Sequence, residues 1–230
     1  MKVYTMSHND IAVLVVVALI IYFFISRNFK RKRAEQFNYI ENYTFPVKVG
    51  LQVKKAYPHL SDMDVQKVLK GLRDYFYISK ISDSDEIVGM PSLVVDVAWH
   101  EFILFTKEYA HFCQKAFGKF HHHIPAEAME SKNDAQFSIR VAWRHACKKE
   151  YIYMPDPKRL PLLFAIDTTL KIEDGFHYTL NCKEDSDAYC VKNIGSTGKG
   201  GFGGSGCGGG GCGGHSGCSG GSGCGGGCGG

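Results

Sequence analysis

The chain has 230 residues and a formal net charge of +4 at neutral pH. Five basic side chains lie between positions 27 and 33, so this one segment exceeds the net charge and the rest of the chain is close to neutral. Proteins that bind nucleic acid spread basic charge over a broad surface. We therefore expect no nucleic-acid partner.

An apolar segment near the N-terminus is the first predicted element. Residues 11–25, IAVLVVVALIIYFFI, carry no charged side chain. A helix that crosses the hydrocarbon core needs about 20 residues. The uncharged stretch 11–26 is shorter, but Arg27 and Lys30 can extend their charged ends to the lipid headgroups and make up the difference. The sequence therefore predicts a short N-terminus (1–10) and a transmembrane helix (11–26) that is embedded in a lipid bilayer.

The basic juxtamembrane segment 27–35 predicts the orientation of this helix. Its basic residues are Arg27, Lys30, Arg31, Lys32 and Arg33. Basic residues stay on the cytoplasmic side of a membrane span, so we expect the N-terminus outside and the C-terminus in the cytoplasm, at a bacterial inner membrane. A cleaved signal peptide is the alternative, but its basic residues would precede the apolar run and an Ala-x-Ala site would follow it. The basic residues are also able to bind anionic lipid headgroups.

Residues 36–192 mix apolar and charged side chains, and their length suits one domain with its own core. The expected fold class is mainly α, with a single N-terminal transmembrane helix, a small cytosolic helical bundle and a disordered tail. The pattern predicts a first bundle helix over 46–57, with Thr44 as its N-cap. A second helix is predicted after Ser61, where Asp64 completes a variant capping box.

A long apolar run over 92–117 follows, and it ends at Gly118. Because it is apolar nearly all round, it is predicted as one central, buried helix. Asn133 is predicted as the N-cap of the next helix. The residues of that helix expected to face inward are Phe137, Val141 and Ala142. The run that starts at Leu160 predicts a final helix, and the short segment 176–182 is compatible with a strand.

Histidines are concentrated in and after the long predicted helix. Asp96 and His100 are one turn apart and share a face, which is a spacing that a metal site can use. A third ligand would come from a triplet folded back toward this face. The triplet consists of His121, His122 and His123. The segment is not the HExxH zinc motif, because Leu104 occupies the position of its second histidine. Acid–base catalysis and a buried Asp96–His100 hydrogen-bonded pair are the alternatives.

Four cysteines precede the tail. Cys113 and Cys147 lie within helical patterns and are predicted to be small core residues. Cys182 and Cys190 flank an acidic segment, and their spacing is not C-x-x-C. If the C-terminus is cytoplasmic, we expect both of these to be reduced.

The tail, residues 193–230, consists largely of glycine, serine and cysteine. Glycine loses much entropy on ordering and this segment has almost nothing to bury, so it is predicted to be disordered. Its cysteines are Cys207, Cys212, Cys218, Cys224 and Cys228. Flexible thiolates can bind Zn²⁺ or Cu⁺. A passive tail is the alternative. Enzymatic modification is another, because the composition is similar to the core of thiazole/oxazole-modified microcins.

The stretch from Phe45 to Cys182 resembles a family of uncharacterised bacterial membrane proteins that are loosely called glycine-rich domain-containing proteins. The stretches that carry the resemblance are YPHLSDMDVQKVLKGLRDYF, VVDVAWHEFILFTKEYAHFC, FGKFHHHIP and LPLLFAIDTTLKI. The resemblance implies an N-terminal anchor, a helical domain and a Gly/Cys-rich C-terminus. Asp96, Trp99 and His100 are also similar to a motif of plant glycine-rich domain proteins, in which W-H-x-H is usual and Phe102 here replaces the second histidine.

Three functional hypotheses follow from the sequence. The first is a non-enzymatic single-pass membrane protein, which docks a protein partner through its helical domain or tail, or binds metal through thiols. The second is a metal-dependent enzyme with a site at Asp96, His100 and the histidine triplet. The third is a chain whose tail is a substrate for post-translational modification.

Overall fold

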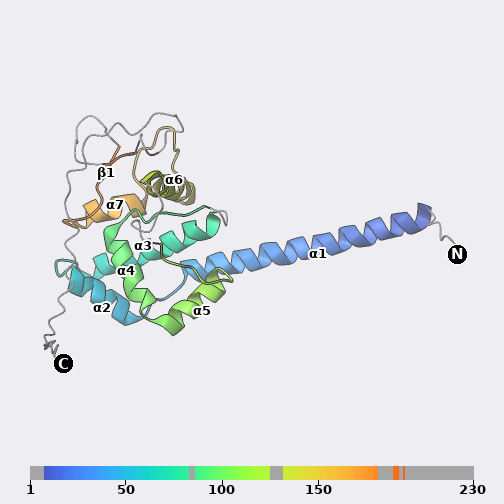
Figure 1. The fold of residues 1–230 in the computed structure, drawn as a ribbon, viewed down its shortest axis with the longest axis horizontal. Coiled ribbons are helices and arrows are strands. Elements are labelled where there is room, and N and C mark those ends of the chain that lie inside the picture. Colours follow the sequence, from blue (N-terminus) through green and yellow to red (C-terminus); the bar gives the residue numbers. More distant parts are fainter. Residues whose placement is uncertain (1–7, 83–85, 125–131, 181–188, 192–193, 195–230) are drawn as a thin grey trace, which may run out of the picture. The chain divides into compact units, whose positions relative to one another are not determined.

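The computed structural model of this protein is mainly helical, as predicted (Figure 1). Its described residues are 8–82, 86–124, 132–180, 189–191 and 194. They form seven helices and one pair of two-residue strands. The tail predicted to be disordered, 193–230, lies outside the described residues except for Ile194.

Helix α1 (His8–Glu41) contains the predicted span 11–26 and is long and apolar enough to cross a membrane. The described apolar side chains of that span are exposed, so they are not part of the protein core. The helix does not end at the basic segment. It continues because residues 27–41 contain neither proline nor glycine, and because Ile40 at its end is fully buried in the core. The predicted border between residues 35 and 36 therefore lies inside a helix.

Helix α2 (Val47–Ala56) begins after Pro46, which occupies the N-cap position without a side-chain hydrogen bond. The prediction that Thr44 caps this helix is therefore wrong, because the helix starts too far along the chain. Val49 and Val53, one turn apart, are fully buried and attach α2 to the core.

Helix α3 (Asp62–Ile81) opens on the predicted capping box. The Ser61 hydroxyl accepts a hydrogen bond from the Asp64 backbone N–H, and the Asp64 carboxylate accepts one from the Ser61 backbone N–H, both at 3.2 Å. These bonds pair donors that a helix N-terminus otherwise leaves unsatisfied. The buried face of α3 includes Val65, Val68, Leu72, Tyr75 and Phe76.

The single central helix predicted over 92–117 is wrong. The structure has two helices, α4 (Leu93–Ile103) and α5 (Thr106–Ala116), which are separated at Leu104 and Phe105. Phe105 has φ −82° and ψ 63°, which interrupts the helical hydrogen-bond ladder. The break gives α5 its own direction, so that its apolar face turns to the core while Leu104 is 72% exposed. The buried face of α5 consists of Tyr109, Phe112, Cys113 and Ala116.

Helix α6 (Lys132–Lys149) agrees only partly with its prediction. It already includes Asn133, which is therefore not its N-cap. Val141 and Ala142 are buried as predicted. Phe137, however, is 54% exposed, because it lies on the side of α6 away from the neighbouring helices.

Helix α7 (Leu162–Thr169) confirms the predicted final helix. The segment that is compatible with a strand forms β1 (Tyr178–Thr179), which pairs in parallel with β2 (Tyr189–Cys190). Cys113 and Cys147 are buried free thiols, as predicted for core residues. Cys190 is disulfide-bonded, which contradicts the expectation that it is reduced. Cys182 lies outside the described residues.

Aromatic side chains from four segments meet at the centre of the core. The Phe76 ring on α3 lies 4.8 Å from that of Phe112 on α5, and the Phe45 ring before α2 lies 5.1 Å from that of Phe102 on α4. Each of the four is at most 5% exposed. Offset and edge-to-face aromatic pairs stabilise a core beyond their buried area, so these contacts fix how α3, α4 and α5 pack together.

Candidate metal centre

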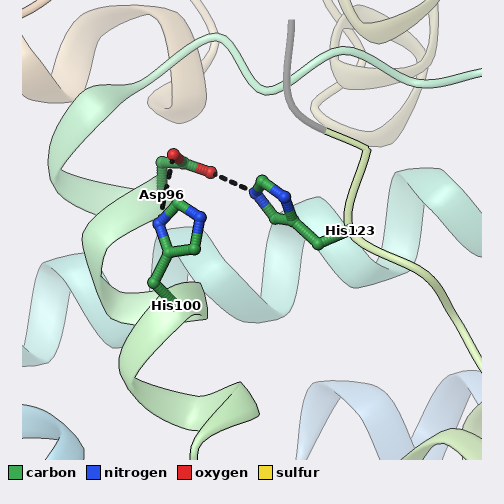
Figure 2. A group of neighbouring side chains, drawn as sticks. All are labelled: Asp96, His100 and His123. Atoms are coloured by element: carbon green, nitrogen blue, oxygen red, sulfur yellow. Dashed lines mark hydrogen bonds and ion pairs between the residues drawn. The ribbon is translucent and has the colours of Figure 1, made fainter. Parts of the chain in front are cut away.

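The candidate site lies along one face of α4, from Asp96 in its first turn to His100 in its last turn. Asp96 and His100 project from one face of this helix, and His123 reaches them from the segment after α5 (Figure 2). His123 Nε2 is 2.9 Å from Asp96 Oδ1, and His100 Nδ1 is 3.4 Å from Asp96 Oδ2. One potential ligand atom from each residue lies within 4.8 Å of the other two. The carboxylate therefore sits between two imidazole rings.

Helix α4 is held in place by a buried carboxylate from α7. Asp167, which is 1% exposed, accepts hydrogen bonds from the Ser92 hydroxyl at 2.6 Å and the Leu93 backbone N–H at 2.8 Å. Its second oxygen also accepts the Phe176 backbone N–H at 2.9 Å. The Ser92 hydroxyl in turn accepts the Val95 backbone N–H at 3.2 Å. The first turn of α4, which carries Asp96, is thus capped by the adjacent Ser92 and by Asp167 from α7.

The segment that carries His123 is fixed by a short hydrogen-bond chain. The Trp99 indole N–H donates to the Tyr109 hydroxyl at 3.1 Å, and that hydroxyl donates to the His121 carbonyl at 2.5 Å. The His121 ring stacks on Phe117 at 4.6 Å and on Trp99 at 5.5 Å. These contacts hold the segment against α4, so that His123 two residues later faces Asp96.

The two ends of the site differ in solvent access. The side chains of His123 and Asp96 are 13% and 23% exposed, whereas that of His100 is 54% exposed. Within the described part of the chain, Asp96 forms ion pairs with these two histidines and with no lysine or arginine. The carboxylate charge is therefore available to a cation that approaches from the His100 side.

The donor set fits a transition-metal ion. Zinc binds imidazole nitrogen and carboxylate oxygen at about 2.0–2.2 Å, so two ligands in tetrahedral geometry are about 3.3 Å apart. The His100–Asp96 separation of 3.4 Å already matches this value. The His123–Asp96 separation of 2.9 Å involves the other carboxylate oxygen and is a hydrogen-bond distance, so it would have to change for both imidazoles to bind one ion. Three protein ligands with one exposed side resemble the open, catalytic type of zinc site.

The structure brings together three of the residues that the sequence proposed. His123 is the member of the triplet that joins Asp96 and His100. His121 instead lies between aromatic rings, and burial together with the positive charges of neighbouring side chains lowers its pKa to about 4. His122 is exposed and contacts the Phe120 ring.

The structure also bears on the alternative of a buried Asp96–His100 pair, whereas the predicted thiol site of the tail is not described. The Asp96–His100 pair forms, but it is not buried. The predicted thiol ligands lie outside the described residues. They are Cys207, Cys212, Cys218, Cys224 and Cys228.

Sequence reasoning missed the residues that position the site. These residues are Trp99, Tyr109 and Phe117. In the single straight helix predicted over 92–117, Tyr109 would lie about 15 Å from Trp99 along the axis. The break at Leu104 and Phe105 brings the two side chains into contact. The local pattern contains no signal for this break beyond the run of apolar residues itself.

Comparison with known proteins gives one finding. Residues 35–197 match the model of a protein family that is described as UCP032817-like. Searches of curated proteins and of solved structures found no match. The matched segment contains the whole candidate metal centre and begins where the basic juxtamembrane segment ends.

Proposed function

This chain belongs to the UCP032817-like family, and from this premise we propose that it is a membrane-anchored protein whose helical domain binds a divalent transition-metal ion. The three ligands are Asp96, His100 and His123. The observation that carries the proposal is their convergence from α4 and a separate segment, with ligand atoms within 4.8 Å of one another.

The chemistry of the donors favours one class of metal. Two imidazoles and one carboxylate suit Zn²⁺ and other borderline divalent ions, whereas Cu⁺ prefers thiolate and thioether ligands. We therefore assign Zn²⁺ to the helical domain and leave Cu⁺ as a candidate for the tail thiols. With one position open to solvent, a bound zinc ion would lower the pKa of a coordinated water and could supply a nucleophile. This is the route by which the domain would act as a hydrolytic enzyme.

We expect the purified full-length protein in detergent to bind zinc in the helical domain independently of the tail. Replacing the five tail cysteines with serine removes the competing thiolates and retains the tail. In this background, His100→Ala and His123→Ala should each lower zinc affinity by at least about 100-fold, because loss of even an outer-shell partner costs about 10–100-fold. Zinc titration followed by calorimetry measures the affinity, and mass spectrometry of the metal content gives the stoichiometry.

His122→Ala is the matched control for this experiment. It removes an imidazole next to His123, but that side chain is exposed, contacts the Phe120 ring and is not one of the three clustered residues, so zinc affinity should stay within about twofold. If the cysteine-to-serine protein binds no zinc while its parent does, the metal is held by the tail and the proposed site is wrong. If neither protein binds zinc, docking of a protein partner becomes the better hypothesis.

We further propose that α1 spans a bacterial inner membrane once, with the helical domain in the cytoplasm. The exposed apolar side chains of 13–25 and the basic residues that follow them support this orientation. The disulfide at Cys190 argues against it, because structural disulfides persist mainly in oxidising compartments.

A topology reporter decides between the two orientations that these observations favour. A reporter that is active only in the cytoplasm and is fused after Gly230 is expected to be active in whole cells. A reporter that is active only outside the cytoplasm, fused at the same position, serves as the control and should be silent. The reverse pattern would overturn the proposed orientation and would agree with the disulfide.

A further inference from the structure

Four basic side chains from three different segments gather beside the membrane-facing part of α1. Lys32 and Arg33 belong to α1, Lys80 lies in the last turn of α3, and Lys119 follows α5. The sequence places only the first two near the apolar segment. The fold adds the other two, and we name the four residues the cationic patch.

The packing of α3 against α1 brings Lys80 to this place. Contacts between the two segments move backward along α1 as they move forward along α3. The Arg73 guanidinium on α3 donates to the carbonyl of Tyr43, two residues after α1, at 3.1 Å, and the Tyr77 ring on α3 lies 4.6 Å from the Phe37 ring on α1. The helices are therefore antiparallel, and the next turn of each brings Lys80 to the level of Arg33. In Figure 1 α3 runs in the direction opposite to α1, and its end lies beside the domain end of α1.

Helix α5 places Lys119 near Lys80 and α1, because Lys119 follows the C-terminus of α5. The Lys80 ammonium lies 5.9 Å from the centre of the Phe117 ring, at the C-terminus of α5. A Cβ placed on Gly118 would be 3.8 Å from the Gln36 side chain, so the chain around Lys119 lies against α1. Burial, followed by the positive charges of Arg33, Lys32 and Lys119, lowers the pKa of Lys80.

The positive charge of the patch is not compensated within the described part of the chain. None of its four residues forms an ion pair there, whereas the neighbouring Arg31 pairs with Glu35 at 3.4 Å. Like charges held together by a fold repel one another and disfavour the compact state. A bound anion removes this repulsion.

The distance from the apolar segment indicates which anion is available. A span of about 20 residues that begins at Ile11 ends near Lys30, and Arg33 lies three residues, or about 4.5 Å, further along the helix axis. The polar headgroup layer is about 5–8 Å thick on each side of the hydrocarbon core. With the apolar segment embedded, the patch lies at the level of lipid phosphates. We propose that the cationic patch binds the headgroups of anionic phospholipids and thereby holds the helical domain against the membrane surface.

This inference rests on the proposed membrane anchoring and is independent of metal binding. The test uses the full-length protein in detergent, titrated separately with dioctanoyl phosphatidylglycerol, dioctanoyl phosphatidylcholine and glycerol phosphate, with bound molecules counted by native mass spectrometry. We expect the phosphatidylglycerol to bind at least tenfold more tightly than either of the others. Lys80→Gln and Lys119→Gln should each weaken its binding about fivefold, since one basic residue near an anionic surface contributes about that factor.

The matched control is the double variant Lys55→Gln, Lys107→Gln, which removes the same charge from exposed positions on α2 and α5. Its affinity for phosphatidylglycerol should stay within twofold. Lys119 is exposed, so its variant tests the inference even if Lys80→Gln unfolds the domain. Equal affinity of the Lys119→Gln and parent proteins for phosphatidylglycerol would overturn the inference, as would equally tight binding of glycerol phosphate. Flotation with phosphatidylcholine vesicles tests the anchoring separately, because it needs no anionic lipid.

Discussion

Replacing Asp167 with alanine is expected to lower the free energy of unfolding by about 4 kcal/mol or more. The carboxylate accepts three short hydrogen bonds, from Ser92, Leu93 and Phe176, and it is almost completely buried. Hydrogen bonds to a charged group contribute about 1.5–3 kcal/mol each, and the variant removes the acceptor of the buried Ser92 hydroxyl and of two part-buried backbone N–H groups. The variant also loses the negative charge that stabilises the N-terminus of α4.

Thermal unfolding followed by tryptophan fluorescence measures this effect, because both tryptophans of the chain, Trp99 and Trp143, are only 2% exposed. A loss of about 4 kcal/mol corresponds to a midpoint lower by roughly 8–16 °C for a domain of this size. Asp156→Ala is the matched control. Its carboxylate is exposed and, among the described residues, forms an ion pair with Lys158 alone, so its effect should be below about 1 kcal/mol. A similar small loss in Asp167→Ala would show that α4 does not depend on this contact.

The second large effect is a loss of stability in acid that originates at His121. Its pKa is 6.5 when the chain is unfolded and about 4 in the folded domain, where burial is the main cause of the shift. Between these two values the unfolded chain binds more protons than the folded one, so stability falls as the pH is lowered through this window. A pKa lowered from 6.5 to about 4 corresponds to roughly 3 kcal/mol of stability lost between pH 6.5 and pH 4.

The variant His121→Phe tests this assignment because it keeps a ring between Trp99 and Phe117 and removes the titrating group. Its Nε2 is buried without a hydrogen-bond partner among the described residues, so no described hydrogen bond to that nitrogen is lost. Urea unfolding at a series of pH values should show a much flatter decline than in the parent. His111→Phe, an exposed control on α5, should decline like the parent. Burial also lowers the pKa of His145, so a residual slope is expected. An unchanged slope in His121→Phe would contradict the prediction.

The parts of the fold that sequence reasoning predicted correctly are those specified within one or two helical turns. The capping box at Ser61 and Asp64 needs two residues three positions apart, and the structure confirms it. The long apolar helix depends only on composition over consecutive residues. The prediction was wrong for the single helix over 92–117. A segment that is apolar on every face gives no sign of where it divides into two helices, each of which buries its own face.

Asp96 and His100 share a helix face, so the sequence alone placed these two candidate ligands together. The sequence did not decide which histidine of the triplet completes the site. That choice depends on the break at Leu104 and Phe105 and on the hydrogen bond from Tyr109 to the His121 carbonyl, which joins residues 12 positions apart. The cationic patch depends in the same way on the antiparallel packing of α3 along α1. Local periodicity is a property of neighbouring residues, whereas these sites arise where separate segments pack, and only the tertiary structure brings them together.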